Sequence, residues 1–167
     1  LKSLKNKIQN VKKNLLPDPI INLNFIIGYS SQNCPFIFYN SHGDYELDKN
    51  VKGEPRVNPT RKHIYFASGP NIIKYDIYNM SQKIFLGHSK PVSNFIIGCK
   101  GELLFSGQKG VNSIIRIWKT ENCKCIKMLT TPLDNLKFLS ENNSSKLLCA
   151  VGNEQLKELI IIWSIEN

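Results

Sequence analysis

The residues of this sequence that could carry out chemistry are few, and their spacing does not group them. Cys123 and Cys125 form a tight pair, but no second pair follows at the spacing of a zinc site. Because side chains two residues apart in a strand point to the same face, packing on one strand face explains the pair. The histidines are scattered along the chain, at His42, His63 and His88. We therefore expect no metal site.

An acidic run and the glycine-containing stretches give no better case for catalysis. Asp44, Glu46 and Asp48 alternate along a polar segment, where a solvated acidic face accounts for them better than a general acid–base pair. The sequence has no Gly-X-Ser-X-Gly elbow, and the stretch GQKG at 107–110 lacks the Gly-Lys-Ser/Thr ending of a phosphate loop. The sequence therefore predicts a protein that is not an enzyme and needs no cofactor.

The composition is that of an ordinary globular chain. Of the 167 residues, 41% are hydrophobic and 21% charged, so we expect one domain or part of one. No apolar run approaches the ~18 residues that a membrane span needs, and no signal peptide opens the sequence. Five cysteines at irregular spacing favour reduced thiols over a disulfide framework. We expect a cytoplasmic protein without membrane contact.

Positive charge is concentrated near the N-terminus. The net charge of +9 favours an acidic partner, which could be nucleic acid, an anionic membrane or an acidic protein surface. Apolar residues recur every three or four positions up to Pro17, which predicts a short amphipathic helix within residues 1–19. This helix is either a connector with a solvated face, or the end of a coiled coil or an arm that touches an acidic partner. Its candidate contacts are Lys2, Lys5, Lys7, Lys12 and Lys13.

Beyond Pro19 the pattern changes to short apolar runs separated by polar turns, which predicts an all-β chain. Three segments, 64–77, 103–120 and 147–165, can be laid over one another. Each is a strand that ends in a small residue, then a loop, then a strand that ends in an aromatic residue. These aromatics, Tyr75, Trp118 and Trp163, are 43 and 45 residues apart. A repeat of this length is typical of a β-propeller blade with four short strands.

The middle unit carries the markers of a WD repeat. Gly87 and His88 precede Trp118 at the spacing that such repeats use, and Ser106 supplies a hydroxyl on an inner strand. We expect the histidine, the hydroxyl and the tryptophan to tie neighbouring strands by hydrogen bonds. The aspartate of the motif is missing, and Lys100 stands at the position we assign to it. The blades are thus divergent.

The number of units predicts an incomplete propeller. A closed propeller has at least four blades, whereas residues 22–165 supply only about three units. An open arc of three blades exposes strand edges and apolar faces. We therefore expect a WD40-type β-propeller segment that packs against remaining blades of a longer parent chain.

The stretch GYSSQNC at 28–34 precedes the first repeat, with Gly28, Tyr29 and Cys34 followed by an apolar strand. Together with FA at 66–67, GH at 87–88, SGQ at 106–108 and LCAV at 148–151, this order resembles the echinoderm microtubule-associated protein-like family. That family consists of tubulin-binding proteins with two joined propellers. Related ciliary tandem-propeller proteins share the SGQ, loop and tryptophan arrangement. The resemblance implies that 20–63 hold the family's hydrophobic motif and outer strands, and 64–167 its first WD-repeat blades.

Two functions remain open. The resemblance implies a non-catalytic scaffold that binds tubulin or other cytoskeletal proteins, in the cytoskeleton or in a cilium or axoneme. The alternative is a general WD-repeat interaction scaffold of another complex, for example in RNA processing. The sequence shows no RNA-recognition signature, which disfavours nucleic acid as the direct partner.

Overall fold

The computed structural model describes residues 20–22, 25–30, 34–40, 43–46, 55–58, 62–76, 79, 81–142 and 146–165. The chain divides into two compact units, residues 1–52 and 53–167, and each is described by itself. The basic helix predicted within 1–19 and its five lysines lie outside the described residues. No helix among the described residues is long and apolar enough to cross a membrane.

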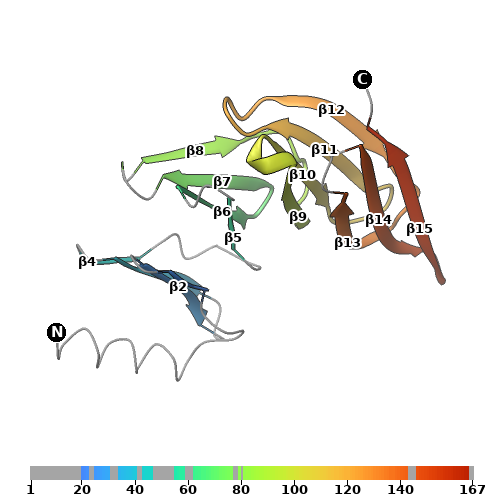
Figure 1. Cartoon of the computed structure of the whole chain (residues 1–167). Helices are drawn as coiled ribbons and strands as arrows, with labels where there is room; N and C mark the ends of the chain where they lie inside the picture. The colour runs from blue at the N-terminus through green and yellow to red at the C-terminus, as the bar shows by residue number, and fades with distance from the viewer. Residues whose placement is uncertain are drawn as a thin grey trace. The chain divides into compact units, whose positions relative to one another are not determined.

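The described residues of the first unit form one antiparallel sheet of four strands in sequential order (Figure 1). Its strands are β1 (Ile20–Asn22), β2 (Phe25–Ser30), β3 (Cys34–Asn40) and β4 (Gly43–Glu46). The stretch GYSSQNC spans the connection from β2 to β3. Ser30 pairs with Cys34 and Gly28 with Ile37, and the register shifts between these two pairs. This irregularity falls at Tyr29, inside the stretch.

The described residues of the second unit form three antiparallel sheets, here called blades 1, 2 and 3, each with its strands in sequential order. Blade 1 consists of β5 (Arg56–Val57), β6 (His63–Ser68), β7 (Asn71–Asp76) and β8 (Ser81–Phe85). Blade 2 consists of β9 (Val92–Gly98), the short helix η1 (Cys99–Gly101), β10 (Leu103–Gln108), β11 (Ile114–Lys119) and β12 (Cys125–Thr130). Blade 3 consists of β13 (Asn135–Glu141), β14 (Leu147–Glu154) and β15 (Lys157–Ser164).

The strand register shows that the three blades are repeats of one unit. Their closing aromatics all lie on the third strand, and each pairs with a fully buried aliphatic residue on the second strand. Tyr75 pairs with Ile64, Trp118 with Leu104, and Trp163 with Leu148. Because equivalent residues meet at equivalent positions, the segments overlaid in the sequence are the same two strands of successive blades. The predicted WD40-type propeller segment is confirmed as the fold.

Among the described residues, the core of the second unit consists of two apolar clusters, one on each face of blade 2. Side chains alternate between the faces of a strand, so neighbouring residues of β10 enter different clusters. Leu104 packs with Tyr65 and Phe85 of blade 1. Phe105 packs with residues of blade 3, including Leu136 and Leu148. Blade 2 is therefore buried on both faces, as an internal blade of a propeller must be (Figure 1).

Two sequence expectations about turns differ from the structure. Lys100 lies in η1, between the first and second strands of blade 2, with φ of 54°. It is therefore not in the turn between the second and third strands, where the aspartate of a WD repeat belongs. Cys123 lies in the turn before β12, with φ of 60°, and only Cys125 is in the strand. The two cysteines thus do not share one strand face, because the turn ends between them.

Candidate functional site: the His88 network of blade 2

His88 lies in the connection between β8 and β9 and is buried against the middle of blade 2, with only 7% of its surface exposed. Its Nε2 atom is 2.7 Å from Ser106 Oγ on β10. Trp118 on β11 donates a hydrogen bond from Nε1 to the same oxygen, over 2.8 Å. One hydroxyl therefore joins a loop and two strands.

Gln108 completes the network in a role that the sequence did not reveal. Its Oε1 atom is 3.2 Å from His88 Nδ1 and also accepts a hydrogen bond from the backbone N–H of Ser89. Because an amide oxygen only accepts, the proton of the imidazole must sit on Nδ1. Nε2 then accepts from the Ser106 hydroxyl, which in turn accepts from Trp118. The hydrogen bonds run in one direction, and every buried polar atom along this path has a partner.

The environment keeps His88 neutral. Burial lowers the pKa of His88 to about 4, and the positive charge of Arg116 lowers it as well, while the hydrogen bond with Gln108 opposes them. A histidine with this pKa and both nitrogens bonded is not matched to acid–base catalysis near neutral pH. The arrangement instead fixes the loop that leads into blade 2.

Aromatic rings surround the network and connect it to blade 1. The rings of Phe85 and Trp118 meet edge to face with centroids 5.7 Å apart, and those of Tyr65 and Phe85 are 6.1 Å apart. Gly87 adopts φ of 154°, and a Cβ atom there would lie 3.2 Å from Arg116 Nη1 and from Trp118. A glycine is needed at this point because the guanidinium and the indole approach the backbone closely.

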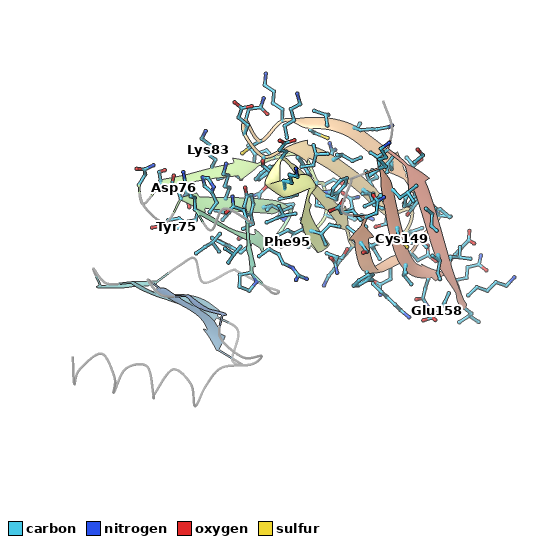
Figure 2. The ribbon with its side chains drawn as sticks, in the orientation of Figure 1. Tyr75, Asp76, Lys83, Phe95, Cys149 and Glu158 are labelled. Carbon is cyan, nitrogen blue, oxygen red and sulfur yellow. The ribbon has the colours of Figure 1, made fainter. Side chains whose placement is uncertain are left out.

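The remaining titratable groups form smaller contacts. His63 Nε2 is 3.7 Å from Asp76 Oδ2 on blade 1, where Figure 2 labels Asp76 beside Tyr75. Burial lowers the pKa of His63, and Lys74 lowers it further, although Asp76 raises it. Burial also raises the pKa of the Cys123 thiol. Within the part of the chain that the structure describes, no three residues of the types His, Cys, Asp and Glu are grouped to hold a metal ion.

A recess on the innermost strands is a second candidate surface. It has a volume of about 350 Å³ and is lined by one strand from each blade, β5, β9 and β13. Apolar residues such as Ile96 and Phe138 form much of its wall, and Arg56 and Glu141 add opposite charges. The volume falls within the range of ligand pockets, but the recess has no group of catalytic side chains.

The structure brings together four of the residues that the sequence singled out. Gly87, His88, Ser106 and Trp118 meet in the network described above. Trp163 lies apart from it, on β15, and packs against the cluster between blades 2 and 3. Gly28, Tyr29 and Cys34 belong to the sheet of the first unit.

Comparison with known proteins supports the WD-repeat fold. No protein-family model matches the chain. It is 27% identical over 91% of its length to WD repeat-containing protein 90 of Xenopus tropicalis, and 26% identical over 89% to that of Homo sapiens. It is 33% identical over half of its length to Centriole proteome protein 16 of Chlamydomonas reinhardtii. The chain spans only 7%, 8% and 4% of these relatives.

A solved structure gives the same answer about the fold alone. Kuenenia stuttgartiensis hydrazine synthase superposes on this chain with a TM-score of 0.66 and 13% sequence identity. The superposition covers 85% of this chain and 43% of the hydrazine synthase chain. At that identity no activity can be carried over. The relatives named above are WD-repeat and centriole proteins and do not support the narrower resemblance to the echinoderm microtubule-associated protein-like family. The fold, the His88 network and the relatives together show a WD-repeat propeller segment.

Proposed function

We propose that this chain is part of a non-catalytic WD-repeat scaffold of the centriole or cilium that associates with microtubules. The observation that carries the proposal is the similarity to a centriole proteome protein, at 33% identity over half of the chain. The His88 network supports a structural role, because its polar atoms are used in holding the blade together.

Charge supports an acidic polymer as the partner. The chain has a net charge of +9, and five of these charges lie within residues 1–16, at Lys2, Lys5, Lys7, Lys12 and Lys13. A basic arm is attracted to an acidic protein surface, and the attraction weakens as salt screens it. The ordered resemblance around Gly28, Tyr29 and Cys34 points in the same direction, since the family it resembles binds tubulin.

Further blades of a longer parent chain are the nearest partners in this proposal. The face of blade 3 that points away from blade 2 carries exposed apolar residues, among them Phe138 at 54%, Ile160 at 69% and Ile162 at 64% exposed. In the register of the sheet, Phe138 and Ile160 both pair with Val151, so they lie on the same face, one on each side of Val151. A further blade would cover them, as blade 3 covers the equivalent face of blade 2.

Co-sedimentation tests the microtubule association. We expect the full-length parent protein to pellet with polymerised tubulin at low salt and less of it to pellet at moderate salt. A matched variant tests the basic arm by replacing Lys2, Lys5, Lys7, Lys12 and Lys13 with glutamine. Less of this variant than of the unmodified protein should pellet at low salt. If no protein pellets at either salt concentration, the proposal is wrong.

A general WD-repeat scaffold of another complex is the second candidate, favoured by the fold itself. Affinity purification of the full-length protein separates the two. Recovery of tubulin and centriolar proteins supports the first candidate. Recovery of RNA-processing subunits without tubulin supports the second.

A further inference from the structure

The outer strands of blade 2 and the loop between β8 and β9 carry a surface that the His88 network does not use, here called the rim patch. It consists of Leu86, Arg116, Cys125 and Met128. Arg116 and Met128 are directly paired across β11 and β12, so their side chains stand on the same face of the sheet. Arg116 Nη1 is 3.6 Å from Cys125 Sγ. Leu86 directly precedes Gly87, where a Cβ atom would lie 3.2 Å from Arg116 Nη1.

Within the part of the chain that the structure describes, Arg116 is a positioned cation without a counter-charge. Its Cζ atom lies 5.8 Å from the centre of the Trp118 ring, which holds the guanidinium in place. Among the described residues no carboxylate forms an ion pair with it, and its buried Nε atom has no hydrogen-bond partner. Leaving a guanidinium N–H unpaired is unfavourable, and a carboxylate is the group that its geometry fits best.

Large exposed apolar side chains lie on the segments that adjoin this cation, with Met128 as its direct partner in the register. Leu86 is 67% exposed and Met128 59% exposed, and Ile126 on the same strand is 51% exposed. Apolar side chains gathered beside an unpaired cation are typical of a surface that binds another protein. The combination selects a segment with both a carboxylate and a large apolar side chain.

We propose that the rim patch binds an acidic, amphipathic segment of a partner protein. A carboxylate of that segment pairs with Arg116, and an adjacent apolar side chain packs on Leu86 and Met128. The proposal does not depend on microtubule association, since any acidic partner with this pattern fits the patch.

Peptide binding to the intact chain tests the proposal. The probe is a fluorescein-labelled peptide in which aspartate and leucine alternate, measured by fluorescence anisotropy. We expect Arg116→Gln to weaken binding about tenfold or more, because a charge-assisted pair is lost. Leu86→Ser should weaken binding several-fold. Because the Leu86 side chain is exposed and lies outside the core, this substitution should leave the fold intact. Arg116→Lys should bind with intermediate affinity, because the charge is kept and the planar fork is lost.

The matched control is Lys127→Gln. Lys127 lies next to Met128 on β12 but pairs with Ile117, so it stands on the opposite face of the sheet from Arg116 and Met128. Its replacement removes the same charge. It should change the affinity by less than about twofold, as surface charges usually do. Two control peptides separate the parts of the proposal: one with asparagine for aspartate, and one with glycine for leucine. Both should bind more weakly.

Four results would overturn the proposal. The first is that the unmodified chain does not bind the aspartate–leucine peptide, and the second is that Arg116→Gln and Lys127→Gln lose equal peptide affinity. The third is that the glycine-containing peptide binds as tightly as the aspartate–leucine peptide. The fourth is that a uridine oligonucleotide binds more tightly than the aspartate–leucine peptide. The last would show that the cation recognises phosphate. Sedimentation of Arg116→Gln with microtubules is read separately, so failure of the rim patch and failure of the microtubule proposal are distinguishable.

Discussion

Trp118 Nε1 and Ser106 Oγ lie 2.8 Å apart, and this hydrogen bond joins the third strand of blade 2 to the second at its buried centre. The same oxygen meets His88 Nε2 at 2.7 Å, so the bond also connects the strands to the preceding loop. Equivalent positions in the other blades have no hydroxyl. Ser106 corresponds to Phe66 in blade 1 and to Ala150 in blade 3, as the strand registers show. Among the described blades, blade 2 alone is held in this way.

Replacing Ser106 with alanine should destabilise the chain by about 2–3 kcal/mol, because the indole N–H and His88 Nε2 lose their shared partner while they stay buried. Urea denaturation followed by tryptophan fluorescence measures the change. Ser89→Ala is the control, since the Ser89 side chain is exposed and only its backbone N–H enters the network. Equal stability of the two variants would contradict the network.

Replacing Gln108 with glutamate should raise the pKa of His88 well above its present value of about 4. A carboxylate at this position would stabilise the protonated imidazole, because a nearby negative charge favours the positively charged form. Titration of the His88 ring protons by NMR measures this shift. The titration of His63, which has Asp76 as its own neighbour, should not move. An unchanged His88 pKa would mean that Nδ1 does not bond to this side chain.

The unfolding free energy should fall as the pH decreases below 6.5. The pKa of His88 is about 4 in the folded chain and near 6.5 when the chain is unfolded, so between these values only the unfolded state gains a proton. The stability is therefore fully present above pH 6.5 and declines by up to about 1.4 kcal/mol per pH unit below it. Urea titrations between pH 7 and about 5, above the range in which carboxylates titrate, measure the slope. In His88→Gln the unfolding free energy should change less steeply with pH. If the slope is unchanged, another titratable group causes the pH dependence.

Gly107→Ala should destabilise the contact between blades 2 and 3 by about 2 kcal/mol. A Cβ atom at Gly107 would overlap the side chain of Leu136, which is buried on β13. The double variant with Leu136→Ala creates room for the methyl group, so its loss of stability should be less than the sum of the two single losses. Thermal melts of the three variants measure this coupling. Strict additivity would show that the two residues do not meet.

The sequence alone determined the architecture, because the architecture follows from local pattern. Short apolar runs with polar turns predict strands, and the spacing of Tyr75, Trp118 and Trp163 predicts repeated blades. The partners of His88 at Ser106 and Trp118 could also be predicted, since the motif places a hydroxyl and an indole at known distances along the chain. The helix predicted within 1–19 stays a prediction.

Only the tertiary structure decided which side chains meet across strands and blades. Gln108 reaches His88 because a register shift at the end of β10 sets its position against β9, and nothing in the local pattern encodes that shift. The prediction for Lys100 is wrong because the sequence does not show where each strand ends. Without the strand ends, the turn that holds a given residue cannot be identified, and Lys100 lies in the turn between β9 and β10. In the sequence, Arg116 is an ordinary basic residue of a strand. Its Nε atom is buried without a partner only because Gly87 and Trp118 lie beside it in the folded chain. Periodicity fixes which face of a strand a residue occupies, whereas its partners there depend on how separate blades stack.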